Sequence, residues 1–131
     1  WITLDQCVEF VMNGFKRMQG GEIFVPKIPS VTVTDLAASL APDLKQKIIG
    51  IRPGEKLHEV MCPKDDSFHT IEFDDHFVIK PTINFSEDID YTTNKLGAKG
   101  KYVDDGFEYN SLNNDHYLSI DELKELNKSV A

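Results

Sequence analysis

One run of ten residues, Gly50-Ile51-Arg52-Pro53-Gly54-Glu55-Lys56-Leu57-His58-Glu59, combines residue types that suit the binding of a phosphorylated ligand. The dipeptide Pro53-Gly54 predicts a tight turn between Arg52 and Glu55. A planar guanidinium can bind a diphosphate through two parallel hydrogen bonds, and a carboxylate can accept both hydroxyl groups of a ribose diol. An ion pair between the two side chains at the surface is the alternative, and the residue types alone leave both interpretations open.

A second candidate is the pair Tyr91 and Lys95, which matches the Tyr-x-x-x-Lys pattern of short-chain dehydrogenases. In that pattern one helical turn places a lysine where it lowers the pKa of the phenol. Here the pair lies in a polar, glycine-bearing stretch, and no cofactor-binding unit precedes it in the chain. A chance match is therefore the favoured interpretation.

Several common motifs are absent from the sequence, namely Gly-x-Gly-x-x-Gly, Gly-x-x-x-x-Gly-Lys-Ser/Thr and Gly-x-Ser-x-Gly. No site for the pyrophosphate of a nucleotide cofactor is therefore expected. The histidines are not spaced as metal ligands, so no metal site is expected either; they are His58, His69, His76 and His116. Three acidic pairs are interpreted as solvated turn residues rather than catalytic carboxylates: Asp65-Asp66, Asp74-Asp75 and Asp104-Asp105.

The composition indicates one soluble globular domain. The chain has 131 residues, of which 40% are hydrophobic and 27% charged, and its mean hydropathy is -0.33. A net charge of -8 disfavours binding to nucleic acid or to an anionic membrane surface, and no apolar stretch approaches the roughly 20 residues that span a bilayer. Cys7 and Cys62 are expected to be reduced, buried thiols, which fits a cytoplasmic protein.

The first third of the chain shows two helical patterns with a strand between them. Thr3-x-x-Gln6 predicts a capping box at the start of the first helix. A short strand is predicted over 22–25, with Pro26 and Pro29 keeping it out of any ladder. Thr34 is predicted to cap the second, shorter helix.

The candidate turn is predicted to lie between two regular elements. Residues 47–51 have the composition of a strand, and residues 55–61 carry one apolar helical face. Such a strand, turn and helix would hold Arg52 at the end of the strand.

The remaining elements complete a mixed α/β (α+β) fold with short helices and small β elements. Two alternating runs, 69–73 and 77–79, predict a β-hairpin. Residues 82–114 have no sustained period and are predicted to be loop. Ser119-x-x-Glu122 predicts a second capping box, which opens a C-terminal helix.

Four further segments accompany the run 50–59: Trp1-Ile2-Thr3-Leu4, Gly21-Glu22-Ile23-Phe24-Val25-Pro26-Lys27-Ile28-Pro29-Ser30, Asp90-Tyr91-Thr92-Thr93-Asn94-Lys95-Leu96-Gly97, and Tyr109-Asn110-Ser111 through Leu118-Ser119. Together they resemble the inverting UDP-N-acetylglucosamine 4,6-dehydratases, a family of the extended short-chain dehydrogenase/reductase superfamily. Pro53 and His58 favour this family over the related dehydratase/epimerases of capsule synthesis. The resemblance covers nearly the whole chain but only the last two-fifths or so of a family member.

The resemblance implies that residues 1–131 are the C-terminal substrate-binding portion of a longer enzyme. An N-terminal Rossmann domain, missing from this chain, would bind NADP and carry the catalytic residues, so no catalytic or cofactor-binding residue is expected here and the chain alone would be inactive. By position in the motif, Arg52 would bind the diphosphate of a UDP-sugar and Glu55 its ribose hydroxyls. The full-length enzyme would be a homo-oligomer.

The family reaction is that of a lyase. Hydride passes from sugar C4 to NADP, a proton leaves C5 and water leaves C6, and the hydride returns to C6 with inversion at C5. The 4-keto-6-deoxy product leads to pseudaminic acid, a bacterial surface and flagellin glycan, within polysaccharide biosynthesis. Three alternatives remain: a non-catalytic UDP-sugar-binding or oligomerisation module, a related dehydratase/epimerase of capsule synthesis, and a structural domain without a ligand.

Overall fold

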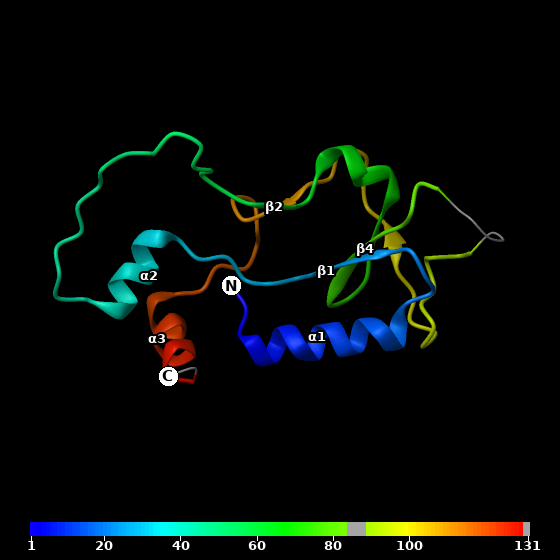
Figure 1. Cartoon of the computed structure of the whole chain (residues 1–131), viewed down its shortest axis with the longest axis horizontal. Helices are drawn as coiled ribbons and strands as arrows, with labels where there is room; N and C mark the ends of the chain where they lie inside the picture. The colour runs from blue at the N-terminus through cyan, green and yellow to red at the C-terminus, as the bar shows by residue number, and fades with distance from the viewer. Residues whose placement is uncertain (84–88, 130–131) are drawn as a thin grey trace.

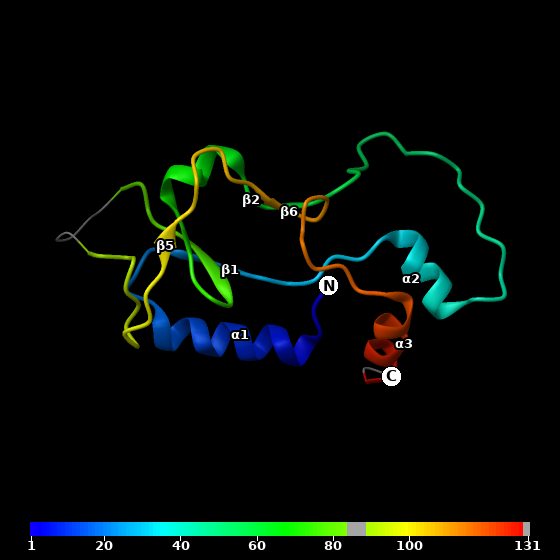
Figure 2. The same ribbon diagram turned by 180° about the vertical axis from the view of Figure 1, so that it is seen from behind.

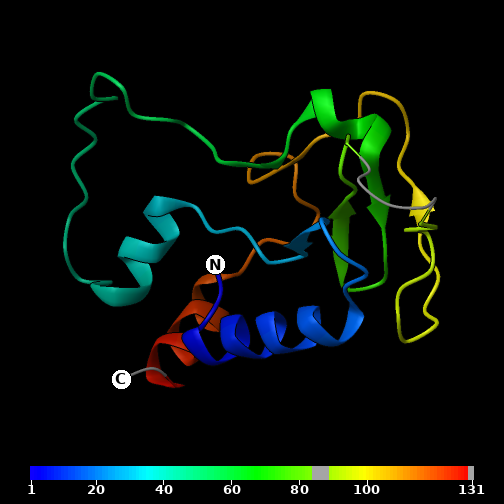
Figure 3. The same ribbon diagram turned by 45° about the vertical axis from the view of Figure 1, so that its right-hand side comes forward.

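A computed structural model describes residues 1–83 and 89–129, whose elements form two groups (Figure 1). An antiparallel sheet with a helix packed beside it forms one group, and a pair of short helices forms the other (Figure 3). The mixed α/β class predicted from the sequence is confirmed. The elements in chain order are α1 (Leu4–Arg17), β1 (Ile23–Pro26), α2 (Val33–Leu40), β2 (Val60–Cys62), the 3-10 helix η1 (Lys64–His69), β3 (Thr70–Glu72), β4 (His76–Ile79), β5 (Lys101–Tyr102), β6 (Tyr109–Asn110) and α3 (Ile120–Ser129).

Helix α1 begins at the predicted capping box. Thr3 Oγ1 accepts a hydrogen bond from the backbone N–H of Gln6, and Gln6 Oε1 accepts one from the backbone N–H of Thr3, at 3.2 and 3.0 Å. One side of the helix packs on the sheet through Phe10 and Arg17, both of which lie against His76. The helix therefore forms a layer beside the strands (Figure 3).

The opposite, apolar side of α1 is exposed. Leu4 and Phe15 are 76% and 65% exposed, and Val8 and Val11 are about half exposed. Cys7 is exposed as well, so the expectation of a buried thiol there is wrong, because within the described chain no other element covers this side of the helix. Cys62 is free and buried, as expected.

The main sheet has the strand order β1-β4-β3-β5. The predicted hairpin is confirmed as β3 and β4, joined by a turn at Asp74 and Asp75. The prediction that prolines keep β1 out of a ladder is wrong, because β1 pairs with β4 from Ile23 to Pro26. Pro26 is the last residue of the strand, where the missing N–H interrupts no ladder.

The segment between α2 and β2 is an irregular, exposed loop that arches away from both groups (Figures 1 and 2). The strand predicted over 47–51 and the helix predicted over 55–61 are wrong; the only regular structure in that range is the start of β2. The apolar side chains of these two segments contact no surface that would bury them, since Ile48 is 78% and Leu57 87% exposed. The tight turn is correct: Glu55 N–H donates to the carbonyl of Arg52 at 3.1 Å, and Gly54 has a φ of +80°.

Two smaller corrections concern the rest of the chain. Thr32, not Thr34, caps α2, since Thr32 Oγ1 accepts from Asp35 N at 3.1 Å. Residues 82–114 contain β5 and β6 within the predicted loop, and 84–88 lie outside the described residues. The predicted capping box of α3 is present at Ser119.

Strand β6 pairs with β2 and leads into the region that joins the two groups (Figure 2). The hydroxyl of Tyr109 accepts a hydrogen bond from Ile28 N–H at 2.8 Å and donates one to Ile28 C=O at 2.9 Å. The Tyr109 ring also packs on Phe77 in a core cluster formed around Val25, Cys62 and Phe77. The segment after β1 is thus held to β6 by a side chain.

Candidate functional site

Arg52 and Glu55 meet across the predicted turn. Arg52 donates to Glu55 through its backbone N–H at 2.9 Å, through Nε at 3.4 Å and through Nη2 at 3.2 Å. The two side chains are 77% and 41% exposed. These hydrogen bonds, from the Arg52 side chain first and its backbone second, lower the pKa of the Glu55 carboxyl below its usual value.

This arrangement is the surface ion pair that the residue types allowed, and it bears directly on ligand binding. A guanidinium has five N–H donors. Glu55 accepts from the N–H of Nε and from Nη2. A diphosphate can therefore bind the remaining donors or displace the carboxylate. Glu55 released from the guanidinium in this way has Oε1 free to accept a hydroxyl group, while Oε2 still accepts from the Arg52 backbone N–H and keeps one further lone pair.

The loop around the turn has two points of attachment. On one side the Gln46 side chain donates to the carbonyl of Thr34 at 2.9 Å. On the other, Glu59 and Ser111 form a reciprocal pair: Glu59 N–H donates to Ser111 Oγ at 2.9 Å, and Ser111 N–H donates to Glu59 C=O at 2.8 Å. The sequence does not predict this role of Ser111, because 52 positions separate it from Glu59.

A cavity of about 280 Å³ lies where the loop is attached to β6. Glu59 and Ser111 line it, together with Met61, Asn110 and Asn114 among others. The Arg52 and Glu55 side chains do not line it. The end of the motif, but not the turn itself, thus borders this cavity.

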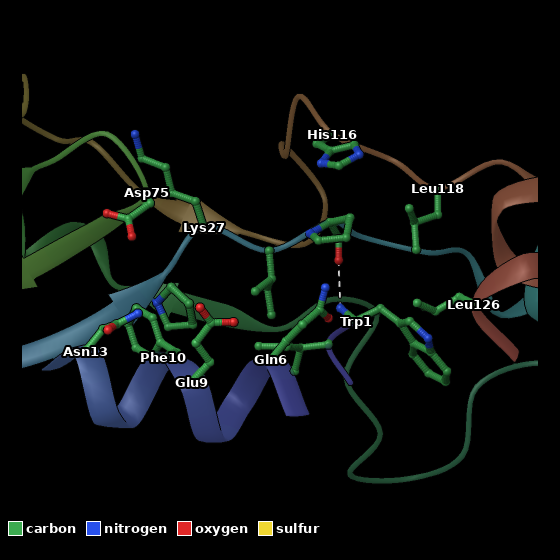
Figure 4. A pocket seen from close by; sticks show the side chains of 14 residues that line it. Trp1, Gln6, Glu9, Phe10, Asn13, Lys27, Asp75, His116, Leu118 and Leu126 are labelled. Atoms are coloured by element: carbon green, nitrogen blue, oxygen red, sulfur yellow. Dashed lines mark hydrogen bonds between the residues drawn. The ribbon is translucent and has the colours of Figure 1, made fainter. Parts of the chain in front are cut away.

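A larger cavity of about 540 Å³ lies between α1, the segment after β1 and the segment before α3 (Figure 4). Gln6, Glu9 and Asn13 line it from α1, and Lys27 and Asp75 line it from across the cavity (Figure 4). Arg52 and Glu55 do not line this cavity either, so it is separate from the predicted site.

His76 is buried beside that cavity and belongs to a structural cluster. Its ring stacks on Phe73 with centroids 4.8 Å apart, and its Nδ1 lies 2.7 Å from Asp75 Oδ1. Burial lowers the pKa of His76 and outweighs the Asp75 carboxylate, which would raise it. For Asp75, burial would raise the pKa, but hydrogen bonds from His76 and Arg17 outweigh it and hold the pKa below its usual value.

The two members of the Tyr-x-x-x-Lys pattern do not form a site. Tyr91 is buried in the core, and its hydroxyl donates to the carbonyl of Gly20 at 2.8 Å. Lys95 is exposed, and its backbone N–H donates to the carbonyl of Arg17. The phenol therefore has a structural partner.

Across residues 1–83 and 89–129, no three His, Cys, Asp or Glu residues are grouped so that they could hold a metal ion. None of the helices in these ranges is both long and apolar enough to cross a bilayer.

Comparison with known proteins identifies relatives. The chain is 54% identical over 127 residues to UDP-N-acetylglucosamine 4,6-dehydratase (inverting) of Campylobacter jejuni subsp. jejuni serotype O:2, and 51% identical to the protein of that name from serotype O:23/36. Each alignment covers 96% of this chain and 38% of the relative, so the chain spans less than two-fifths of their length.

The solved structure of Pen from Bacillus thuringiensis superposes with a TM-score of 0.71 at 27% identity, over 99% of this chain and 38% of that one. The resemblance found in the sequence is thus confirmed. A family model described as polysaccharide biosynthesis protein matches residues 1–81. The chain belongs to this family of polysaccharide biosynthesis proteins.

Proposed function

We propose that residues 1–131 are the UDP-sugar-binding portion of an NADP-dependent, inverting UDP-N-acetylglucosamine 4,6-dehydratase. The observation that carries the proposal is the 54% identity over 96% of the chain to a relative of that name. In the proposed enzyme, a lyase of the cytoplasm, the 4-keto-6-deoxy product serves pseudaminic acid and flagellin glycan synthesis. The active enzyme is a homo-oligomer.

In this proposal Arg52 binds the diphosphate and Glu55 the ribose hydroxyls. The turn supports the assignment because the guanidinium and the carboxylate already face each other, so one ligand bearing a diphosphate next to a ribose can engage both. A single exposed cation at a turn also suits a chain of net charge -8, since a dianionic ligand needs local rather than general positive charge.

The described residues do not fit NADP. The sequence has no glycine-rich phosphate-binding turn between a strand and a helix, and the hydroxyl of Tyr91 is bonded to Gly20 rather than open to a cofactor. We therefore assign NADP and the chemical steps to an N-terminal Rossmann domain outside this chain, and assign this chain substrate binding without activity of its own.

The exposed side of α1 favours a second candidate, a non-catalytic UDP-sugar-binding or oligomerisation module. Four large apolar residues lie on that side at spacings of four, three and four, which is the pattern of a helix that packs against another element; they are Leu4, Val8, Val11 and Phe15. The first candidate and a UDP-sugar-binding module both require UDP to bind the chain, whereas an oligomerisation module does not.

Calorimetric titration and thermal denaturation with UDP test the assignment. Saturation at 100 times the dissociation constant is expected to add about 2.7 kcal/mol to the free energy of unfolding. Arg52→Ala is expected to weaken UDP binding by on the order of 2 kcal/mol, about 30-fold. Lys47→Ala, which removes another exposed cation of the same loop, serves as the matched control. Equal affinities of the wild type and Arg52→Ala would exclude Arg52 from the site.

A further inference from the structure

The position of the Arg52–Glu55 turn depends on where its loop is attached. Hydrogen bonds within the turn connect Arg52 only to Glu55 and fix its internal shape. On the N-terminal side the loop is attached through Gln46, six residues before Arg52. In the described part of the chain, the hydrogen bonds that link residues 47–59 to other segments are made by Glu59, and both go to Ser111. This attachment lies only four residues beyond Glu55 in the chain.

Ser111 is itself firmly held. It follows Asn110, which is 3% exposed, pairs with Val60 in the β2–β6 ladder, and accepts from two backbone N–H groups through Oδ1. The hydroxyl of Tyr117 donates to the carbonyl of Ser111. Glu59 is therefore bonded to a residue that directly follows β6 and has a hydrogen-bond partner of its own.

We propose that Ser111 is a positioning residue for the UDP-binding turn; this inference rests on the proposed function. Its hydroxyl supplies one of the two hydrogen bonds to Glu59. Without the hydroxyl, the Glu59 N–H loses its partner, and Glu59 is held to Ser111 by one hydrogen bond instead of two. The turn then samples more orientations. Ordering it around a diphosphate costs more conformational entropy, and this cost lowers the affinity for UDP.

The test compares UDP affinities by calorimetry in the 131-residue chain. Ser111→Ala is expected to raise the dissociation constant for UDP about fivefold, the effect of losing one neutral hydrogen bond. Ser111→Thr keeps a hydroxyl and is expected to restore the wild-type value. Ser119→Ala is the matched control, because it removes a serine hydroxyl that caps α3. It is expected to lower the melting temperature and leave the dissociation constant unchanged.

A double-mutant cycle separates positioning from a general loss of stability. If Ser111 acts through the turn, its substitution has a smaller effect when Glu55→Gln has already removed part of the contact with the ligand. An unchanged dissociation constant in Ser111→Ala, while Arg52→Ala binds weakly, would refute the positioning role and leave the proposed function standing. Equal UDP binding by the wild type and Arg52→Ala, or none by either, refutes the proposed function and the positioning role with it.

Discussion

The end of α1 is held to the turn between β3 and β4 by an ion pair between Arg17 and Asp75, whose Nη1 and Oδ2 atoms lie 2.8 Å apart. The other carboxylate oxygen of Asp75 accepts from His76, whose side chain is 1% exposed. The helix, the hairpin and a buried imidazole are thus coupled through one carboxylate.

This cluster predicts a loss of stability at mildly acidic pH. The folded protein keeps His76 neutral because burial lowers its pKa, whereas the unfolded chain takes up a proton near the ordinary value of 6.5. The unfolded state therefore binds more protons below that pH, and stability falls as pH decreases from 6.5 toward the lowered pKa. The lowered pKa of Asp75 adds a further loss only below its ordinary value of 3.8.

Melting temperatures measured from pH 7.5 to 5.0 check this expectation. His76→Phe, which keeps an aromatic ring in the stack, is expected to flatten the decline in melting temperature. His116→Gln, at an exposed histidine, is expected to keep the wild-type decline. An equally steep decline in His76→Phe would assign the pH dependence to other groups.

Gly100 is predicted to tolerate no side chain. A methyl group there would lie 2.7 Å from Ile71 Cγ2, 2.8 Å from the carbonyl oxygen of Glu72 and 2.9 Å from Phe73 Cε2. Gly100→Ala is therefore expected to lower the free energy of unfolding by about 3 kcal/mol, measured by urea denaturation. Gly14→Ala is the matched control, since a methyl group at that site in α1 would meet no atom within 4 Å outside the backbone of its own helix, and it is expected to stabilise the protein by about 0.5–1 kcal/mol.

The two cysteines are predicted to differ in reactivity. Burial, with the nearby Asp66 carboxylate, raises the pKa of the Cys62 thiol to about 12, whereas Cys7 is exposed. A thiol reagent at pH 8 should therefore modify one equivalent rapidly in the native protein and the second only after unfolding. Rapid modification remaining in Cys7→Ser would show that Cys62 becomes accessible in the folded state.

Glu55→Gln is predicted to affect the recognition of ribose more than that of phosphate. Under the proposed function, the wild type binds UDP more tightly than 2′,3′-dideoxy-UDP because the carboxylate accepts the two hydroxyl groups. We expect the variant to bind UDP about fivefold more weakly and to lose most of this preference. Asp43→Asn, an exposed acid of the same loop, is expected to retain it; retention by Glu55→Gln as well would remove the ribose role.

The exposed side of α1 is predicted to cause self-association of the chain. Val8→Asp combined with Phe15→Asp should lower the average mass measured by sedimentation equilibrium without lowering stability, because both side chains are exposed. Leu57→Asp, at an exposed leucine of the loop, is expected to leave the mass unchanged. Association that persists in the double variant would place the contact elsewhere.

Local signals in the sequence predicted local structure well. The capping boxes at Thr3 and Ser119, the hairpin and the turn at Arg52 depend on residues within a few positions of one another. The strand predicted over 47–51 failed because its apolar residues require a surface to pack on, and the described chain provides none.

Features that depend on distant partners were not predictable in this way. Strands β5 and β6 have two residues each, so they exist only through pairing with β3 and β2. The hydrogen bonds between Ser111 and Glu59 were not predictable for the same reason, since nothing near Ser111 in the sequence indicates that it contacts Glu59. In the candidate site, the interaction between Arg52 and Glu55 could be predicted from the sequence, whereas the attachment of their loop to Ser111 could not.

The hydroxyl of Tyr109 bonds both main-chain groups of Ile28, a task that an opposing strand residue performs in a ladder. One phenol thus makes the two hydrogen bonds of an additional ladder position, and no continuous strand is needed across the junction between the two groups of elements. Phenylalanine would fill the same volume and leave the Ile28 N–H without its partner, whereas the Ile28 carbonyl would still accept from Asn114 Nδ2 at 2.7 Å; the hydroxyl, not the ring, therefore satisfies this N–H.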